Sequence, residues 1–257
     1  MLGLVFALLV PPADVSAIRT GVSRIASPGV PGPIGVFGPD AVVVFDAKSD
    51  RGRLPVVAVS QLGRGKIVAF GHGGYMGAPD AGDTRRLLAN AVRWAGGASA
   101  TVYAPGNGGL QTALRGYGIT VLTDGAGFDR LPRPGSVLIA DAHALRPEQV
   151  PALRAYLQQG GHWVTSGLGW GWSQVNRRPV SELPANALLA EAGLVFTDGY
   201  LDPDANGLIT TGEPTAFSHA GAALDALRSD RVPNADAAVA AVRGVLDVLP
   251  GDHPFAQ

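Results

Sequence analysis

The sequence contains no cysteine among its 257 residues. That absence excludes disulfides, thiolate-bound metals, a cysteine nucleophile and a lipid-modified cysteine anchor together. Charged residues are also scarce, at 16% of the chain, and the formal net charge is -1. The lysines and arginines form no basic stripe, so we expect no nucleic-acid partner. A hydrophobic content of 46% excludes a disordered chain.

A run long enough to span a membrane is missing as well. The apolar residues 2–10 are too few to cross a bilayer, and two prolines follow them. Small residues at 15–17 match the positions that a signal peptidase reads. The pattern predicts a signal peptide over 1–17, cleaved near Ala17, and therefore export to the periplasm or the extracellular space. No lysine or arginine precedes Arg19, so a buried first strand or a misplaced start codon remains an alternative.

The apolar pattern then alternates between strand and helix periods. It predicts strands at 41–45, 55–60, 66–70, 101–104, 119–122, 136–140 and 162–166, and helices at 83–96, 107–115, 147–160, 185–192, 219–228 and 235–249. Strand–helix–strand units with short connections favour an α/β fold with a doubly wound, mostly parallel, flavodoxin-like sheet. Residues 55–70 form a predicted N-terminal β-hairpin elaboration. We expect one domain over 18–230, with 231–257 as a C-terminal helix and tail that could link to a missing domain.

Three unusual stretches carry a family resemblance: PGVPGPIGVFGPDA (28–41), LGRGKIVAFGHGGYM (62–76) and GGHWVTSGLGWGWSQVN (160–176). They resemble the N-terminal region of enhancin-type metallopeptidases and of TRP-channel-associated factors. The resemblance implies a non-catalytic domain of class I glutamine-amidotransferase-like fold that precedes a peptidase domain. The chain has neither a His-Glu-x-x-His zinc motif nor the cysteine of amidotransferases. No catalytic residue can therefore be transferred.

In a parallel sheet, ligands bind at the carboxyl ends of the strands. His72 and Tyr75 follow the strand 66–70 in a glycine-rich segment, and Ser166 ends the strand 162–166. His72 could bind a ligand or transfer a proton, and a histidine that only closes a tight turn is the alternative. Ser166 lacks the glycine two residues earlier that a nucleophile elbow carries.

The string GLGWGW at 167–172 holds two tryptophans two residues apart. In an extended segment, Trp170 and Trp172 would lie on one side, where exposed indoles suit sugar rings or apolar ligands. Ser173, Gln174 and Asn176 could add hydrogen bonds. The alternative is that both indoles fill space between this loop and a helix.

Residues 202–213 match a calcium-binding loop, with oxygen ligands expected from Asp202, Asp204, Asn206 and Glu213. The flanks do not fit, because 196–201 has a strand pattern and Pro214 would interrupt an exiting helix. We therefore expect a solvated turn in which Asp202 caps nearby backbone amides, and we predict no metal site.

Two functional hypotheses follow. The first is a non-catalytic accessory or binding domain, associated with an enhancin-type peptidase, that recognises a glycan or a protein surface without a cofactor. The peptidase could be covalently linked. The second is a small hydrolase or transferase that uses His72, Ser166 and a carboxylate such as Asp141. It requires His72 and Ser166 within about 3–4 Å of each other or of one water.

Overall fold

The core of the molecule is a seven-stranded sheet. The computed structural model describes residues 14–229 and 235–257. The strand order is β3-β4-β5-β9-β8-β6-β7, and the neighbours from β5 to β7 are parallel. The predicted α/β fold with a mostly parallel sheet is therefore confirmed. The strands span Val42–Ser49 (β3), Gly52–Leu62 (β4), Gly65–Phe70 (β5), Val102–Tyr103 (β6), Val121–Leu122 (β7), Val137–Ile139 (β8) and His162–Ser166 (β9).

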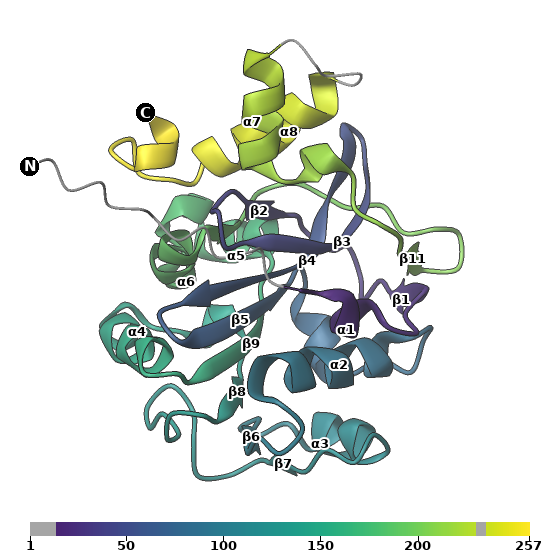
Figure 1. Ribbon diagram of the computed structural model, residues 1–257, viewed down its shortest axis with the longest axis vertical. Coiled ribbons are helices and arrows are strands. Elements are labelled where there is room, and N and C mark those ends of the chain that lie inside the picture. Colours follow the sequence, from purple (N-terminus) through teal and green to yellow (C-terminus); the bar gives the residue numbers. More distant parts are fainter. Residues whose placement is uncertain (1–13, 230–234) are drawn as a thin grey trace, which may run out of the picture.

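Helices cover both faces of this sheet (Figure 1). On one face lie α2 (Thr84–Gly96) and α3 (Gly108–Arg115), and on the other α4 (Val150–Gln158) and α6 (Pro184–Leu189). Side chains of a strand alternate between faces. In β5, Val68 and Phe70 join the first core, whereas Ile67 and Ala69 join the second. This burial on both sides explains the continuous apolar strands in the sequence.

The predicted hairpin over 55–70 is present as the antiparallel pair β4 and β5, which closes at Leu62 and Gly65. Gly63 in its turn has a φ of +61°, and a Cβ there would lie 2.7 Å from the Cα of Gln158. The turn therefore requires glycine at this position. β3 adds a further antiparallel strand at the sheet edge.

Two small antiparallel pairs lie outside the central sheet. β1 (Arg24–Ala26) pairs with β11 (Leu208–Thr210), and β2 (Ile34–Val36) pairs with β10 (Leu194–Phe196). The free edge of β10 is covered by Asn186, whose side chain accepts from the Phe196 amide at 2.8 Å and donates to its carbonyl at 2.9 Å. The strand pattern at 196–201 was misleading, since β10 ends at Phe196 and the chain continues as a loop.

The N-terminal segment packs against α2. α1 (Ser16–Arg19) buries Val15 and Ile18, and the indole Nε1 of Trp94 donates to the Asp14 carbonyl at 2.9 Å. Residues 1–13 of the predicted signal peptide lie outside the described part of the chain. Cleavage near Ala17 would remove the buried Val15 side chain.

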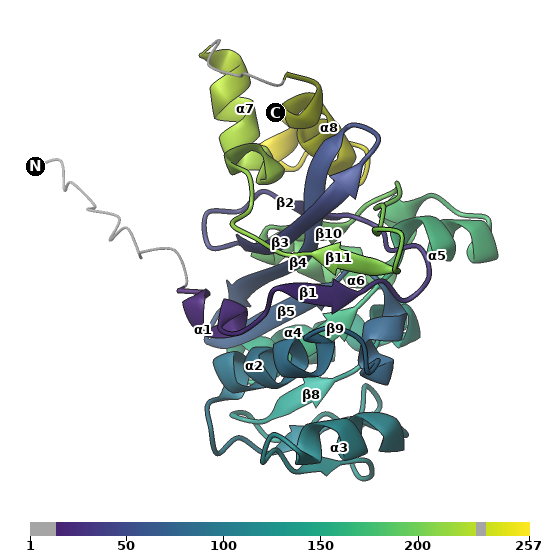
Figure 2. The same cartoon turned by 90° about the vertical axis from the view of Figure 1, so that its right-hand side faces the viewer.

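Two helices close the C-terminal end. α7 (Ala220–Arg228) and α8 (Ala235–Leu246) lie beside the tip of the β3–β4 hairpin, as Figure 2 shows. They share a third apolar core with Phe37 and Val195. The Val245 side chain lies close enough to β2 that a Cβ on Gly35 would approach it to 2.6 Å. The predicted domain boundary between 230 and 231 lies outside the described residues. The helices before and after it, α7 and α8, contribute to the same apolar core.

Candidate functional site

The carboxyl ends of β5, β8 and β9 bring together Asp141 and Ser166. The Ser166 hydroxyl donates to Oδ2 of Asp141 at 3.2 Å, and the His143 amide donates to Oδ1 at 2.8 Å. A Cβ on Gly73 would lie 2.7 Å from Oδ2, so only glycine lets this backbone approach the carboxylate. The sequence-based expectation that these segments meet at the strand ends agrees with this geometry.

His72 and His143 flank this carboxylate, and each accepts a backbone hydrogen bond. Nδ1 of His72 accepts from the Gly74 amide at 2.8 Å, and Nε2 of His143 accepts from the Leu168 amide at 2.9 Å. Burial lowers the pKa of His72; the nearby Asp141 opposes this effect and His143 adds to it. Both accepting nitrogens must be unprotonated, so both rings are neutral in this arrangement.

This cluster does not form a nucleophile–base pair. Ser166 is fully buried and donates to Asp141, while His72 accepts from the backbone. Within residues 14–229 and 235–257, no hydrogen bond joins His72 to Ser166. An activated serine needs an adjacent base that takes its proton, and His72 is not placed for that role here.

Tyr75 lies inside the core rather than beside a ligand site. Its ring is fully buried and packs on Phe70 with centroids 5.6 Å apart. Burial raises the pKa of Tyr75 far above its ordinary value, and its hydroxyl has no partner in the described structure. The side chain therefore supports the first core.

The tryptophan string is helical, and the extended geometry expected for it is wrong. α5 spans Gly169–Asn176, so Trp170 and Trp172 point to different sides of a helix. Trp172 is buried in the second core and fills space as the alternative predicted. Trp170 stays partly exposed and packs on Tyr200, with ring centroids 5.2 Å apart and ring planes tilted by 50°. We call Trp170 and Tyr200 the aromatic pair.

Two polar side chains of this string form hydrogen bonds with the backbone of α5 or of the segment that follows it. The Ser173 hydroxyl donates to the Arg178 carbonyl at 2.7 Å, and the Asn176 amide donates to the Trp172 carbonyl at 2.8 Å. Gln174 is exposed. Tyr200, which is 58% exposed, was not among the predicted site residues. Its loop shows no periodicity, so only the isolated aromatic after Gly199 could have indicated it.

A cavity of about 610 Å³ opens beside the aromatic pair. Its lining comes from α8, the tip of the β3–β4 hairpin, the loop 197–200 and neighbouring segments, and it does not include Asp141 or Ser166. Ile34, Val180 and Val248 give it apolar walls, and Tyr200 lies on its lining. Its charged lining residues are Asp50, Arg51, Asp198, Arg243 and Asp247.

The calcium-loop pattern at 202–213 folds as a turn fixed by arginines. Oδ1 of Asp204 accepts from the amides of Asn206 and Leu208, and its other oxygen pairs with Arg24. Glu213 pairs with Arg19 at 2.5 Å. The capping residue is therefore Asp204, and the expectation of Asp202 in that role is wrong. Within the described residues, no cluster of three His, Asp or Glu side chains could hold a metal ion.

The structure is that of an α/β domain with a mostly parallel central sheet. It is similar to part of IMPa from Pseudomonas aeruginosa in complex with an O-glycopeptide, with a TM-score of 0.51 and 17% identity, over 77% of this chain and 23% of that one. At this identity the similarity concerns the fold alone.

Sequence similarity identifies the family of the chain. The chain belongs to the family described as "TRPM8, N-terminal domain", whose model matches residues 12–208. TRPM8 channel-associated factor 2 of Bos taurus is 31% identical over 74% of this chain, and that of Homo sapiens is 28% identical over 61%. The chain spans about a fifth of those relatives, 20% and 16% of their lengths. The predicted resemblance is thus supported in both parts, by sequence for the channel-associated factors and by fold for the peptidase.

This relationship corrects one prediction. The prediction of export to the periplasm or the extracellular space is wrong, because the relatives are named as TRPM8 channel-associated factors. The apolar start and small residues misled the prediction, and the expected basic residues before the run were missing. None of the helices in the described part of the chain is long and apolar enough to cross a bilayer.

Proposed function

We propose that this chain is a non-catalytic accessory domain that recognises the surface of a partner protein through the aromatic pair and the adjoining cavity. The observation that carries the proposal is the exposed Tyr200 ring, held against Trp170 at the lining of a 610 Å³ cavity. Aromatic side chains next to a pocket dominate the binding energy of protein interfaces. The relatives named as factors associated with the TRPM8 channel also support a protein partner.

A glycan is the less favoured ligand. A sugar platform needs an open ring face with free polar groups around it. Trp172 is buried, and Nε1 of Trp170 is buried with no partner among the residues that the structure describes. The hydrogen-bonding groups of Ser173 and Asn176 already bind the backbone of α5 and of the segment after it. These features leave the tryptophan string itself with few free hydrogen-bond donors for a sugar.

The non-catalytic part of the proposal rests on the strand-end cluster. Ser166 is buried and bound to Asp141, and His72 and His143 each accept a backbone amide. Each of these three side chains thus has a hydrogen bond within the fold. The cluster fixes three loops relative to one another and thereby positions the start of α5.

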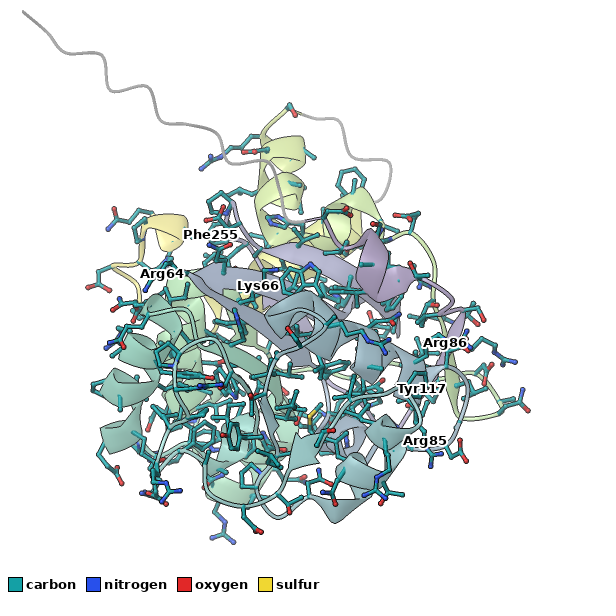
Figure 3. The ribbon with its side chains drawn as sticks, turned by 60° about the horizontal axis from the view of Figure 1, so that its bottom comes forward. Arg64, Lys66, Arg85, Arg86, Tyr117 and Phe255 are labelled. Carbon is teal, nitrogen blue, oxygen red and sulfur yellow. The ribbon has the colours of Figure 1, made fainter. Side chains whose placement is uncertain are left out.

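Binding to purified TRPM8 channel in detergent tests the proposal, with this chain immobilised for interferometry. Tyr200→Ala should weaken binding at least about 10-fold, because loss of an interface anchor costs about 2 kcal/mol. Tyr117→Leu, beside α3 and labelled in Figure 3, is a matched control on another part of the molecule and should bind normally.

Three results would count against the proposal. They are no binding, equal binding by the Tyr200→Ala variant, and binding that disappears when the channel is enzymatically deglycosylated. The last result would assign the site to a glycan instead, and binding to O-glycosylated mucin would then support that assignment.

A further inference from the structure

The loop that carries Tyr200 also carries a carboxylate without an opposite charge. Asp198 is exposed and lines the same cavity as Tyr200. Its Oδ1 accepts only the amide of the next residue, Gly199, at 2.9 Å. Within the described ranges, 14–229 and 235–257, Asp198 forms no ion pair. The carboxylate therefore keeps one oxygen for a ligand.

The other charges of the cavity offset one another. Arg51 lies 3.7 Å from Asp50 at the tip of the β3–β4 hairpin. Arg243 on α8 and Asp247, directly after the helix, lie four residues apart, and their opposite charges partly neutralise each other. Three aspartates against two arginines leave a net charge of -1 on the cavity lining. Of the three aspartates in the lining, Asp198 is the one with no arginine or lysine close to it in sequence.

The aromatic pair lies at the loop that carries this carboxylate, since Tyr200 follows Asp198 by two residues. A Cβ on Gly32 would approach Cδ1 of Trp170 to 3.4 Å and the Gly199 carbonyl to 3.6 Å, so the indole and the loop are neighbours. Gly199 has a φ of +119°, a conformation that favours glycine and turns the chain between Asp198 and Tyr200. The two rings are tilted by 50° to each other, and Tyr200 is 58% exposed, so its ring can meet a ligand from solvent.

This combination is suited to a cation. Aromatic faces attract ammonium and guanidinium groups within about 6 Å of the ring centroid, and a nearby carboxylate adds charge attraction. The same protein uses this contact internally, since Nζ of Lys66, labelled in Figure 3, lies 4.7 Å from the Trp94 ring centroid. We propose that Trp170, Tyr200 and Asp198 form a site for a lysine or arginine side chain of the partner protein. This inference rests on the proposed function and adds the chemistry of the partner.

Two short capped peptides test the site: acetyl-Gly-Pro-Arg-Pro-Gly-amide, and the same peptide with citrulline in place of arginine. Citrulline keeps the shape and removes the charge. Titration into the 15N-labelled chain, followed by NMR, gives both affinities. The arginine peptide should bind about 10-fold more tightly than the citrulline peptide. That ratio should fall to about 1 in Tyr200→Leu and in Asp198→Asn, and should stay unchanged in the control Tyr117→Leu.

Equal affinities of the two peptides in the unmodified chain would overturn the inference. A ratio that persists in both site variants would overturn it too, because the cation would then bind elsewhere. Asp198 is exposed, so Asp198→Asn should fold, and the NMR spectra report this directly. If binding to the channel depends on Tyr200 while the peptides bind equally, the cation site fails and the proposed function stands. If the channel does not bind but the arginine peptide binds more tightly than the citrulline peptide, the proposed function fails and the cation site stands.

Discussion

Acidification should destabilise this fold well above the pH at which carboxylates protonate. All five histidines use one ring nitrogen to accept a backbone N–H, so each must be unprotonated on that nitrogen in the folded chain. The donor amides and distances are Gly74 to His72 at 2.8 Å, Leu168 to His143 at 2.9 Å, Lys66 to His162 at 3.1 Å, Ala222 to His219 at 3.3 Å and Phe255 to His253 at 3.1 Å.

The pKa shifts of three of these histidines give the direction in which stability changes with pH. Burial lowers the pKa of His72, His162 and His219 below the ordinary 6.5. Lys66 lowers that of His162 further, whereas the bond with Gly38 opposes the effect at His219. A histidine whose pKa is lowered by folding binds its proton more readily in the unfolded chain. Its contribution to stability is therefore complete above pH 6.5 and is lost as the pH falls below that value.

The size of the effect can be taken from the hydrogen bonds. Each protonation removes one acceptor, and a net hydrogen bond contributes about 1 kcal/mol. Three rings then give about 3 kcal/mol as an upper value, because all three are partly exposed and water screens them. At about 2–4 °C per kcal/mol, the melting temperature should fall by up to about 10 °C.

Thermal melts at pH 7.5, 6.5, 5.5 and 5.0 measure this loss. Carboxylates such as Asp83, with an ordinary pKa of 3.8 lowered chiefly by the Ser23 amide, keep their charge over this window. His219→Asn is a matched control, since asparagine can cap the start of α7 without titrating. Its melting temperature should depend less on pH. A melting temperature that is constant or rises between pH 7.5 and 5.0 would refute the reasoning.

Three further predictions concern other parts of the chain. Ser166→Ala should leave any turnover of casein, mucin or generic esters at background, as in the unmodified chain; activity that this variant abolishes would restore the hydrolase hypothesis. Gly167→Ala should destabilise the fold by about 2 kcal/mol or more in urea melts, because its Cβ would lie 2.7 Å from the Phe196 ring; an unchanged midpoint would contradict this. Millimolar calcium should not raise the melting temperature, because Glu213 pairs with Arg19. A rise that is lost in Glu213→Gln would show a calcium site.

The strand and helix pattern was readable from sequence because its causes are local. Strands buried on both faces appear as continuous apolar runs, as in β5 and β9. The hairpin turn at 62–65 requires glycine, and the sequence shows it. The meeting of Asp141 and Ser166 followed from the rule that parallel strands end at one edge.

Local signals failed where distant segments decide the structure. The tryptophan string forms α5 because Trp172 can be buried beside α6, and its glycines obscured any helical pattern. The calcium-loop pattern binds arginines that lie about 180 residues earlier in the chain, through the pairs Arg24–Asp204 and Arg19–Glu213. β10 pairs with β2 across most of the chain.

Composition and spacing by themselves thus determined the fold class, the order of most strands along the chain and the absence of a cysteine or zinc catalytic motif. Only the tertiary structure decided which tryptophan is exposed, that Tyr200 joins it, and that Asp198 lines the same cavity. The reason is that burial and ring contacts depend on how the loop 28–33, the start of α5 and the loop 197–201 pack together. That packing is a long-range property, and no local propensity specifies it.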